Sequence, residues 1–290
     1  MRVLWLSHFV PFPATGHGAL QRSHNLLRQA GSRHDVHLVA LNRVRLLDVE
    51  KGIGAAQAAL NPILQGFSVF PHIGDASRWS RLTCAARAIF RNTSYVEEWL
   101  QSSAFAGEVA RQVAEFAPDI IHVDSIGLIR FVDERYWPRV VLNHHNIESQ
   151  LMRRRAAHQG SGPLGLFFAR EGTRIERLER RAAPHVPMNL VVSILDGARL
   201  DAVAPQSHWL VVENGVDTDY FHRPQEVVGA PNAIAFAGGM DWYPNRHAID
   251  WLCREIWPTL TAGGEAWTAT VIGRSPTADL LALSAADKRV

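Results

Sequence analysis

RVLWLSHFV, residues 2–10, opens the chain as a short apolar run, and the turn-rich PFPATGHG, residues 11–18, follows it. Residues 19–30 then have helical spacing, and a second apolar run lies at residues 35–41. A strand, a glycine loop, a helix and a second strand in this order predict a βαβ unit with a right-handed crossover.

The same alternation continues along the chain. Further short apolar runs predict strands at residues 67–70, 119–123, 140–143, 189–193 and 209–212. A long helical pattern covers residues 95–116. Short, continuous strands that alternate with helices are typical of a parallel sheet covered on both faces, so we expect an α/β fold. In such folds ligands bind in the loops at the carboxyl ends of the strands.

The region after Gly215 predicts a second domain. Residues 216–231 are rich in turn formers and lack periodicity, which indicates a linker. A second βαβ pattern follows, with strands at 233–237 and 269–273 and a helix at 248–260. We therefore expect one domain at 1–215 and another at 216–290. Residues 216–290 are short for a doubly wound domain of roughly 100 to 150 residues, and we interpret this domain as truncated.

Composition and charge exclude several classes of protein. Hydrophobic residues make up 47% and charged residues 20%, which is typical of a globular chain and not of a disordered one. The net charge of +2 gives no footprint for nucleic-acid binding. Cys84 and Cys253 lie far apart and form no C-x-x-C pair, so neither a disulfide framework nor a cysteine zinc site is expected. With no signal-peptide core, a cytoplasmic location is predicted.

The loop Gly16-His17-Gly18 lies between the first predicted strand and helix. Backbone amides and a helix N-terminus at this place favour a phosphate group, and a simple tight turn is an equally good interpretation. Gln21 occupies the third position of a G-x-G-x-x-G pattern, and no acidic residue ends the second strand. Both departures disfavour a dinucleotide-binding oxidoreductase.

The polar run Asn143-His144-His145-Asn146-Ile147-Glu148 follows a predicted buried strand. Its side chains are expected at the ligand-facing edge of the sheet, where histidine and asparagine can hydrogen-bond a sugar hydroxyl. The two adjacent histidines do not match the spacing of an HExxH metal site, so no metal site is expected. Asp124 and Ser125 end another predicted strand, and we interpret them as the N-cap of a helix.

An arginine-rich stretch covers residues 151–185, and apolar residues recur within it at helical spacing. Two interpretations are open. A basic amphipathic helix binds anionic lipid, which would give the protein a peripheral contact with the inner face of the cell membrane. In the favoured interpretation the arginines form a solvated face, supported by pairs such as Glu176 with Arg180, and the apolar stripe packs on the first domain.

Three stretches resemble the family 4 glycosyltransferases of GT-B fold. They are the opening strand with its glycine loop, VVENGVDTDYF at residues 211–221, and FAGGM at 236–240. Within that family the chain is most similar to the sugar transferases that accompany exosortase-linked exopolysaccharide gene sets. This closer likeness depends on HHNIES at 144–149, ERR at 179–181 and MDWYPN at 240–245.

The resemblance implies two Rossmann-like domains that face each other across a cleft. The first would hold a glycan or lipid-linked acceptor and the second a nucleotide-diphosphate sugar, with retention of anomeric configuration and no cofactor or essential metal. By the same resemblance His145 is the catalytic residue that faces the donor sugar. The donor-side glycines are Gly16, Gly18, Gly238 and Gly239, and the residues expected at the acceptor side or the cleft rim are His17, Asn146, Glu148 and Asn214.

Two departures from the family pattern matter. The family's second domain carries an arginine and a lysine that clamp the leaving diphosphate, whereas Gly239 stands at the arginine position here. Arg246 and Arg274 are the candidate replacements. The family's paired glutamates, which bind the donor, lie beyond residue 290, so we expect this chain to be inactive in transfer as given.

Three alternatives remain open at this point. The chain could be a non-catalytic remnant whose first domain binds an acceptor, a partner or a membrane. A GT-B sugar-nucleotide epimerase would use a free nucleotide sugar without an acceptor. A nicotinamide-dependent oxidoreductase is the least favoured, for the reasons given for the glycine loop.

Overall fold

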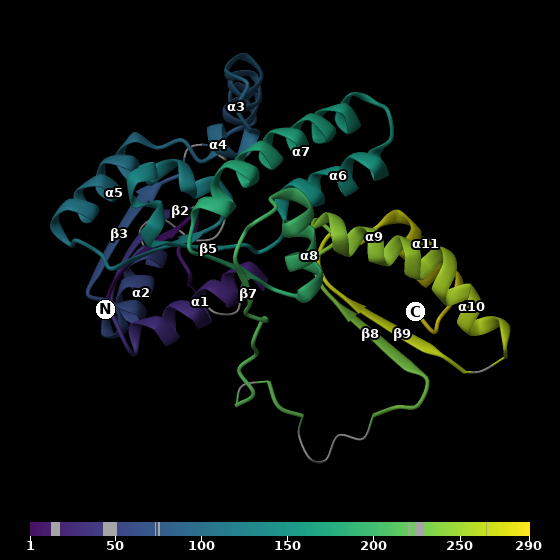
Figure 1. Ribbon diagram of the computed structural model, residues 1–290. Helices are drawn as coiled ribbons and strands as arrows, with labels where there is room; N and C mark the ends of the chain where they lie inside the picture. Colours follow the sequence, from purple (N-terminus) through teal and green to yellow (C-terminus); the bar gives the residue numbers. More distant parts are fainter. Residues whose placement is uncertain are drawn as a thin grey trace. The chain divides into compact units, whose positions relative to one another are not determined.

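The computed structural model describes residues 1–12, 18–42, 51–72, 74, 76–219, 221–223, 229–264 and 266–290. The chain divides into two compact units, Met1–Gly215 and Val216–Val290. Figure 1 shows the first unit in purple to green and the second in green to yellow. Each unit is described here by itself.

The first unit is built on a seven-stranded sheet with the order β3-β2-β1-β4-β5-β6-β7. The strands are β1 (Arg2–Ser7), β2 (Asp35–Asn42), β3 (Gly66–Pro71), β4 (Ile120–Asp124), β5 (Val140–Asn143), β6 (Met188–Val191) and β7 (Trp209–Val211). All pairs are parallel; Leu6 of β1 lies in register with Val39 of β2 and Val123 of β4. This sheet confirms the predicted α/β class. The strand order reverses between β1 and β4, which is the topological switch point.

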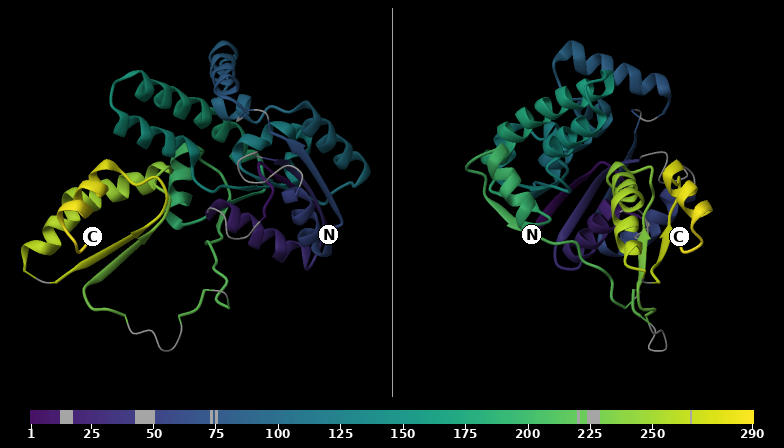
Figure 2. Two further views of the ribbon diagram at one scale, coloured as in Figure 1. Left: turned by 180° about the vertical axis from the view of Figure 1, so that it is seen from behind. Right: turned by 90° about the vertical axis from the view of Figure 1, so that its right-hand side faces the viewer.

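Helices cover both faces of this sheet (Figure 2). They are α1 (Gly18–Gly31), α2 (Lys51–Leu60), α3 (Arg78–Arg91), α4 (Tyr95–Trp99), α5 (Ser103–Glu115), α6 (Glu148–Gln159), α7 (Pro163–Ala182) and α8 (Ile194–Val203), with 3-10 turns at Asn61–Ile63, Ile126–Phe131, Glu134–Arg139 and Ala183–His185. α1 and α2 pack on one side of the central strands, and α5 and α7 pack on the other. Continuous burial explains why β1 and β2 read as unbroken apolar runs.

The single helix predicted over residues 95–116 is wrong, because two helices, α4 and α5, occupy this stretch. Serine caps begin both. Ser94 and Glu97 form a capping box at α4, and the Ser102 hydroxyl oxygen accepts a hydrogen bond from the Phe105 amide at 3.2 Å. These local bonds satisfy the first amides of each helix, and they outweigh the continuous apolar period.

The apolar side of α7 is used inside the first unit. Ile175, Leu178 and Ala182 lie in the main core. Two buried glutamates on the same helix cap other helices. Glu171 accepts the amides of Tyr95 at 2.8 Å and Val96 at 3.2 Å, and Glu179 accepts the Ser149 amide at 3.2 Å.

The outer side of α7 carries most of the arginines of this stretch, and most of them are exposed. The predicted pair of Glu176 with Arg180 is present at 2.7 Å. This arrangement supports the solvated-face interpretation of the arginine-rich stretch. No helix in the part of the chain that the structure describes is both long and apolar enough to cross a membrane.

The second unit has a two-stranded parallel sheet of β8 (Ala233–Ala237) and β9 (Thr268–Ile272). Its helices are α9 (Tyr243–Trp251), α10 (Trp257–Ala262) and α11 (Ala278–Ala286), and a π-helical turn at Leu252–Ile256 joins the first two. The predicted helix at 248–260 thus begins earlier and is interrupted. One sheet face packs on α9 and α11, whereas Thr270 and Ile272 on the other face are exposed.

Candidate functional site

A cluster of polar side chains lies at the carboxyl ends of β1, β4 and β5, next to the switch point of the sheet. Asp124 is the last residue of β4 and Asn143 is the last residue of β5. Arg22 and Ser23 reach the cluster from the second turn of α1, and His145 follows β5. The topology alone therefore brings together side chains from four parts of the chain.

Asp124 is the centre of this cluster and is fully buried. Its Oδ1 accepts hydrogen bonds from Asn143 Nδ2 at 2.6 Å and His145 Nε2 at 2.9 Å, and its Oδ2 accepts from the Ser23 hydroxyl. Burial by itself would raise the pKa of Asp124, but His145 and these hydrogen bonds hold it well below its usual range. The group is therefore an ionised carboxylate with three donors.

The predicted helix N-cap at Asp124 and Ser125 is wrong. Ser125 precedes a 3-10 turn, and its side chain makes no capping hydrogen bond. Asp124 instead accepts side chains from α1 and from the end of β5. A charged group that ends a buried strand can be satisfied only by partners from other elements, and a local sequence motif does not reveal those partners.

His145 is fixed in orientation by Asp124. Because the carboxylate is ionised and can only accept, Nε2 of His145 carries a proton and donates it to Asp124. In the neutral ring Nδ1 is then an acceptor. The ring lies beside His8 and Phe9, both with centroids at 6.4 Å, and its side chain is 10% exposed. His145 is therefore held at the carboxyl edge of the sheet, with a defined tautomer.

Arg22 joins this cluster to the end of β7. Its Nη2 donates to Asn143 Oδ1 at 3.0 Å, and its Nη1 donates to the Val212 carbonyl and to Asn214 Oδ1 at 3.2 Å. Asn143 thus bridges the Arg22 cation and the Asp124 anion. Burial lowers the pKa of Arg22, and the charge of Asp124 opposes this effect. The cluster is a buried ion pair whose polar atoms are connected through an amide.

The neighbouring histidines point inward and serve the core. His144 Nε2 lies 3.0 Å from Asn189 Oδ1, and burial lowers the pKa of His144 to about 4. The His122 ring stacks on Trp5 at 3.6 Å, and burial lowers its pKa to about 4 as well. Both histidines are therefore neutral near pH 7. Of the polar run after β5, alternate side chains turn into the unit, so the run does not face the edge as a whole.

The other predicted rim residues of the first unit lie close to this cluster in the chain. Asn146 hydrogen-bonds Glu148, the first residue of α6, and burial raises the pKa of Glu148. Asn214 contacts Arg22 as described. Gly18 opens α1, and a Cβ at this position would meet no atom within 4 Å. Gly16 and His17 lie outside the described residues.

In the second unit Gly238 and Gly239 follow β8 in a tightly packed turn. A Cβ on Gly238 would lie 2.6 Å from Asn245 Nδ2, which donates to the Gly239 carbonyl at 2.9 Å. A Cβ on Gly239 would lie 2.5 Å from Asp241 Oδ1. Close packing within the unit is thus sufficient to require glycine at both positions.

Arg246 and Arg274 differ in how their charges are used. Arg274 pairs with Asp241 at 3.0 Å, which satisfies its charge locally. Arg246 donates from Nε to the Met240 carbonyl at 3.1 Å and lines an open pocket of about 400 Å³. Thr277, the N-cap of α11, lines the same pocket. Arg246 is therefore the better placed of the two to meet an anion.

Sequence reasoning missed Arg22 and Ser23. A signal was present, because Ser23 lies at helical spacing between Leu20 and Leu27 and therefore on the buried face of α1. A hydroxyl on such a face needs a buried partner, which is Asp124. Among the described residues no three His, Cys, Asp or Glu side chains gather in a way that could hold a metal ion.

Comparisons with known proteins follow from this geometry. No protein-family model matches the chain, and no curated protein matches it. Two solved structures are similar. One is a UDP-glucose: anthocyanidin 3-O-glucosyltransferase in complex with UDP, with 9% identity and a TM-score of 0.46, over 97% of this chain and 68% of that one. The other is the lipopolysaccharide outer core galactosyltransferase WaaB in its apo form, with 12% identity and a TM-score of 0.45, over 100% and 72%.

Proposed function

We propose that the chain is a glycosyltransferase of GT-B type that uses a nucleotide-diphosphate sugar. The observation that carries this proposal is the cluster of Asp124, His145 and Arg22 at the switch point of a parallel sheet. Ligands of open α/β folds bind at this point. The sequence resemblance supplies the chemistry, and the first unit then holds the acceptor while the second holds the nucleotide.

In this proposal His145 contacts the donor sugar and Asp124 is a positioning residue. The Nδ1 atom of the neutral ring accepts a hydrogen bond from a sugar hydroxyl, and Asp124 keeps the proton on Nε2. The Gly16–Gly18 loop lies near the diphosphate. Negative charge develops on that leaving group, and Arg246 with the amides at the start of α11 is the proposed donor set.

Several finer features of the reaction are part of the same proposal. Transfer retains the anomeric configuration, uses no essential metal and builds an exopolysaccharide or another cell-surface glycan from a glycan or lipid-linked acceptor. Catalysis then depends on positioning and electrostatics more than on a covalent side chain. The anomeric configuration of the product, read by proton NMR, separates retention from inversion.

The test is donor turnover by the full chain. Nucleotide-diphosphate sugars of several bases and sugars are incubated with the protein, with and without glycan acceptors, and release of the nucleotide diphosphate is measured. His145→Ala should reduce release by at least about a hundredfold, the loss seen when one preorganised catalytic group is removed. His185→Ala, an exposed histidine on the same unit, is the matched control and should leave release unchanged.

A second candidate function is binding without turnover. It is favoured by the second unit, whose two-stranded sheet has one exposed face. A chain of this kind would bind glycan acceptors in a His145-dependent way and release no nucleotide from any donor. If the panel gives neither turnover nor binding of any sugar nucleotide or glycan, both candidates are contradicted. Epimerised free donor without acceptor would instead indicate a sugar-nucleotide epimerase.

A further inference from the structure

Helix α3 carries the most exposed apolar side chains of the first unit. Phe90 is 89% exposed, Trp79 is 77% exposed, and Leu82 and Ile89 are each more than half exposed. Figures 1 and 2 show α3 at the rim of the unit, beyond α4 and away from the sheet. Single exposed apolar residues are ordinary, but four on one 14-residue helix require an explanation.

The exposed apolar residues form one face of α3. At about 100° per residue, the side chains of 79, 82, 86, 89 and 90 fall within about 100° of arc. The opposite face is narrow and small, and it packs on the unit through Cys84 and Ala88. Cys84 Sγ contacts the Glu98 carbonyl at 3.6 Å. The helix is therefore amphipathic in the reverse sense, with its bulky apolar face directed away from the core.

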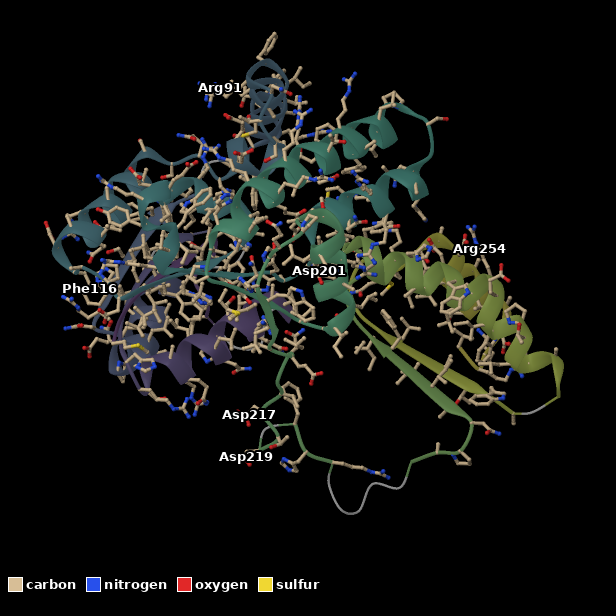
Figure 3. The ribbon with its side chains drawn as sticks, viewed as in Figure 1. Arg91, Phe116, Asp201, Asp217, Asp219 and Arg254 are labelled. Carbon is tan, nitrogen blue, oxygen red and sulfur yellow. The ribbon has the colours of Figure 1, made fainter. Side chains whose placement is uncertain are left out.

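The charges on α3 are all positive. Residues 78–91 contain four arginines and no acidic residue. Arg91, labelled in Figure 3, pairs with buried Glu98 at 3.3 Å, whereas the exposed Arg78, Arg81 and Arg87 have no ion-pair partner among the described side chains. The adjacent Glu97 carboxylate is engaged by the capping box of α4. These three arginines flank the apolar face on both sides.

A second group of arginines lies on the same side of the first unit. Figures 1 and 2 place α3 and the α6–α7 pair together at the top in each view. Arg154, Arg170 and Arg177 on that pair are exposed. Leu164 and Leu166 at the start of α7 are also more than half exposed. The surface around α3 thus combines apolar side chains with positive charge.

We infer that α3 is an interfacial helix that docks the first unit on an anionic lipid surface. Arginines beside an exposed tryptophan and phenylalanine are the composition of helices that lie in the plane of a membrane interface. The negative surface of a bilayer meets the unpaired arginines, and the headgroup layer takes the apolar face out of water. This docking differs from the arginine-rich amphipathic helix considered from the sequence, since the apolar side of α7 is buried. It is independent of the proposed function.

The test is sedimentation of the full chain with vesicles of phosphatidylcholine, with or without phosphatidylserine. Binding should require phosphatidylserine and should fall as salt shortens the screening length. The triple variant R78Q/R81Q/R87Q should bind about a hundredfold more weakly, at about fivefold per arginine. Trp79→Ser with Phe90→Ser should weaken binding at least about tenfold, because less apolar surface leaves water.

Two further variants separate docking from general surface effects. Trp79→Phe keeps an aromatic ring, so it should retain binding but lose the fluorescence that brominated lipid quenches in the parent protein. The matched control R28Q/R33Q removes two exposed arginines at the end of α1 and beyond it, and it should bind as the parent does. All these positions are exposed, so circular dichroism and melting should be unchanged.

Three outcomes would overturn the inference. The parent could bind neutral and anionic vesicles equally or not at all, or the α3 variants could bind as the parent does. In the third outcome the α3 variants abolish a dimer in light scattering and leave vesicle binding unchanged. That result would make the apolar face of α3 an interface between two copies of the chain.

Discussion

The two sheets of this protein differ in how their faces are covered. In the first unit helices pack on both sides of the central parallel strands, and β1 and β2 are buried almost throughout. In the second unit β8 and β9 alternate between partly buried and exposed residues, because helices cover one face only. Parallel strands are usually buried on both faces, so the second sheet is the unusual one.

The difference shows what a buried polar site requires. Asp124 is fully buried and ionised, and it depends on donors that four separate parts of the first unit hold in place. In the second unit the charged groups lie at the surface. Arg274 and Asp241 form their pair with both side chains substantially exposed. A preorganised site therefore belongs to the first unit, whereas the second unit offers adaptable surface charges.

The largest expected effect comes from removal of the central carboxylate. Asp124→Ala leaves Ser23, Asn143 and His145 without an acceptor and Arg22 without its counter-charge, so it should destabilise the first unit by about 4 kcal/mol. Hydrogen exchange measured by mass spectrometry should show the loss in β1, β4 and β5 and none in the second unit. Asp133→Ala, an exposed carboxylate in the same unit, should change stability by less than about 0.5 kcal/mol.

A loss of protection in both units of Asp124→Ala would contradict the comparison. It would mean that the two units unfold together as one cooperative structure.

The parent protein should show the same difference without any substitution. Amides of β8 and β9 should exchange at least about a hundredfold faster than those of β1 and β2, since local opening exposes less buried apolar surface in the second unit. A hundredfold ratio corresponds to about 3 kcal/mol in opening free energy. Uniform protection across residues 1–290 would show that the second sheet is as well supported as the first.

The strands could be predicted from the sequence because their burial is continuous. Apolar runs mark every strand from β1 to β9, and the residues after β5 were placed correctly at a carboxyl end of the sheet. The predicted helix over residues 95–116 failed where serine caps interrupt an apolar period. A capping side chain competes with helix continuation by local hydrogen bonds, and periodicity does not measure that competition.

The site could be predicted only in part, because its partners come from distant parts of the chain. His145 follows a predicted strand, so its place at the edge of the sheet could be predicted. Asp124 has a similar position, but its meaning depends on Ser23, which lies 101 residues away in the sequence. Arg22 reaches Val212, 190 residues away. Such long-range pairs appear only once the sheet order is known.

A smaller effect is expected from the buried carboxyl that caps α6. Burial raises the pKa of Glu179 to about 7 from an ordinary value of 4.5. Between these two values the native state keeps the proton and the unfolded chain releases it, so the stability of the first unit should fall as pH rises. Relative to Glu179→Gln, which cannot ionise, the parent should lose about 2 kcal/mol between pH 5 and pH 7.

Urea unfolding followed by hydrogen exchange at several pH values measures this loss for each unit separately. The Gln variant still presents an oxygen to the Ser149 amide, so it controls for the cap itself. A parallel pH dependence of parent and variant would assign the effect to another group.

The smallest effect compares one substitution on the two sheets. Val39 of β2 is fully buried between helices and neighbouring strands, and Ile272 of β9 is 63% exposed. Replacing each by threonine keeps the β-branched shape and the strand preference. Val39→Thr buries a hydroxyl and should cost about 1 to 2 kcal/mol in the first unit, whereas Ile272→Thr should cost less than about 0.5 kcal/mol in the second. Equal losses, measured by hydrogen exchange at low protein concentration, would mean that the outer face of β9 is covered in solution, and the contrast between the two sheets would then be lost.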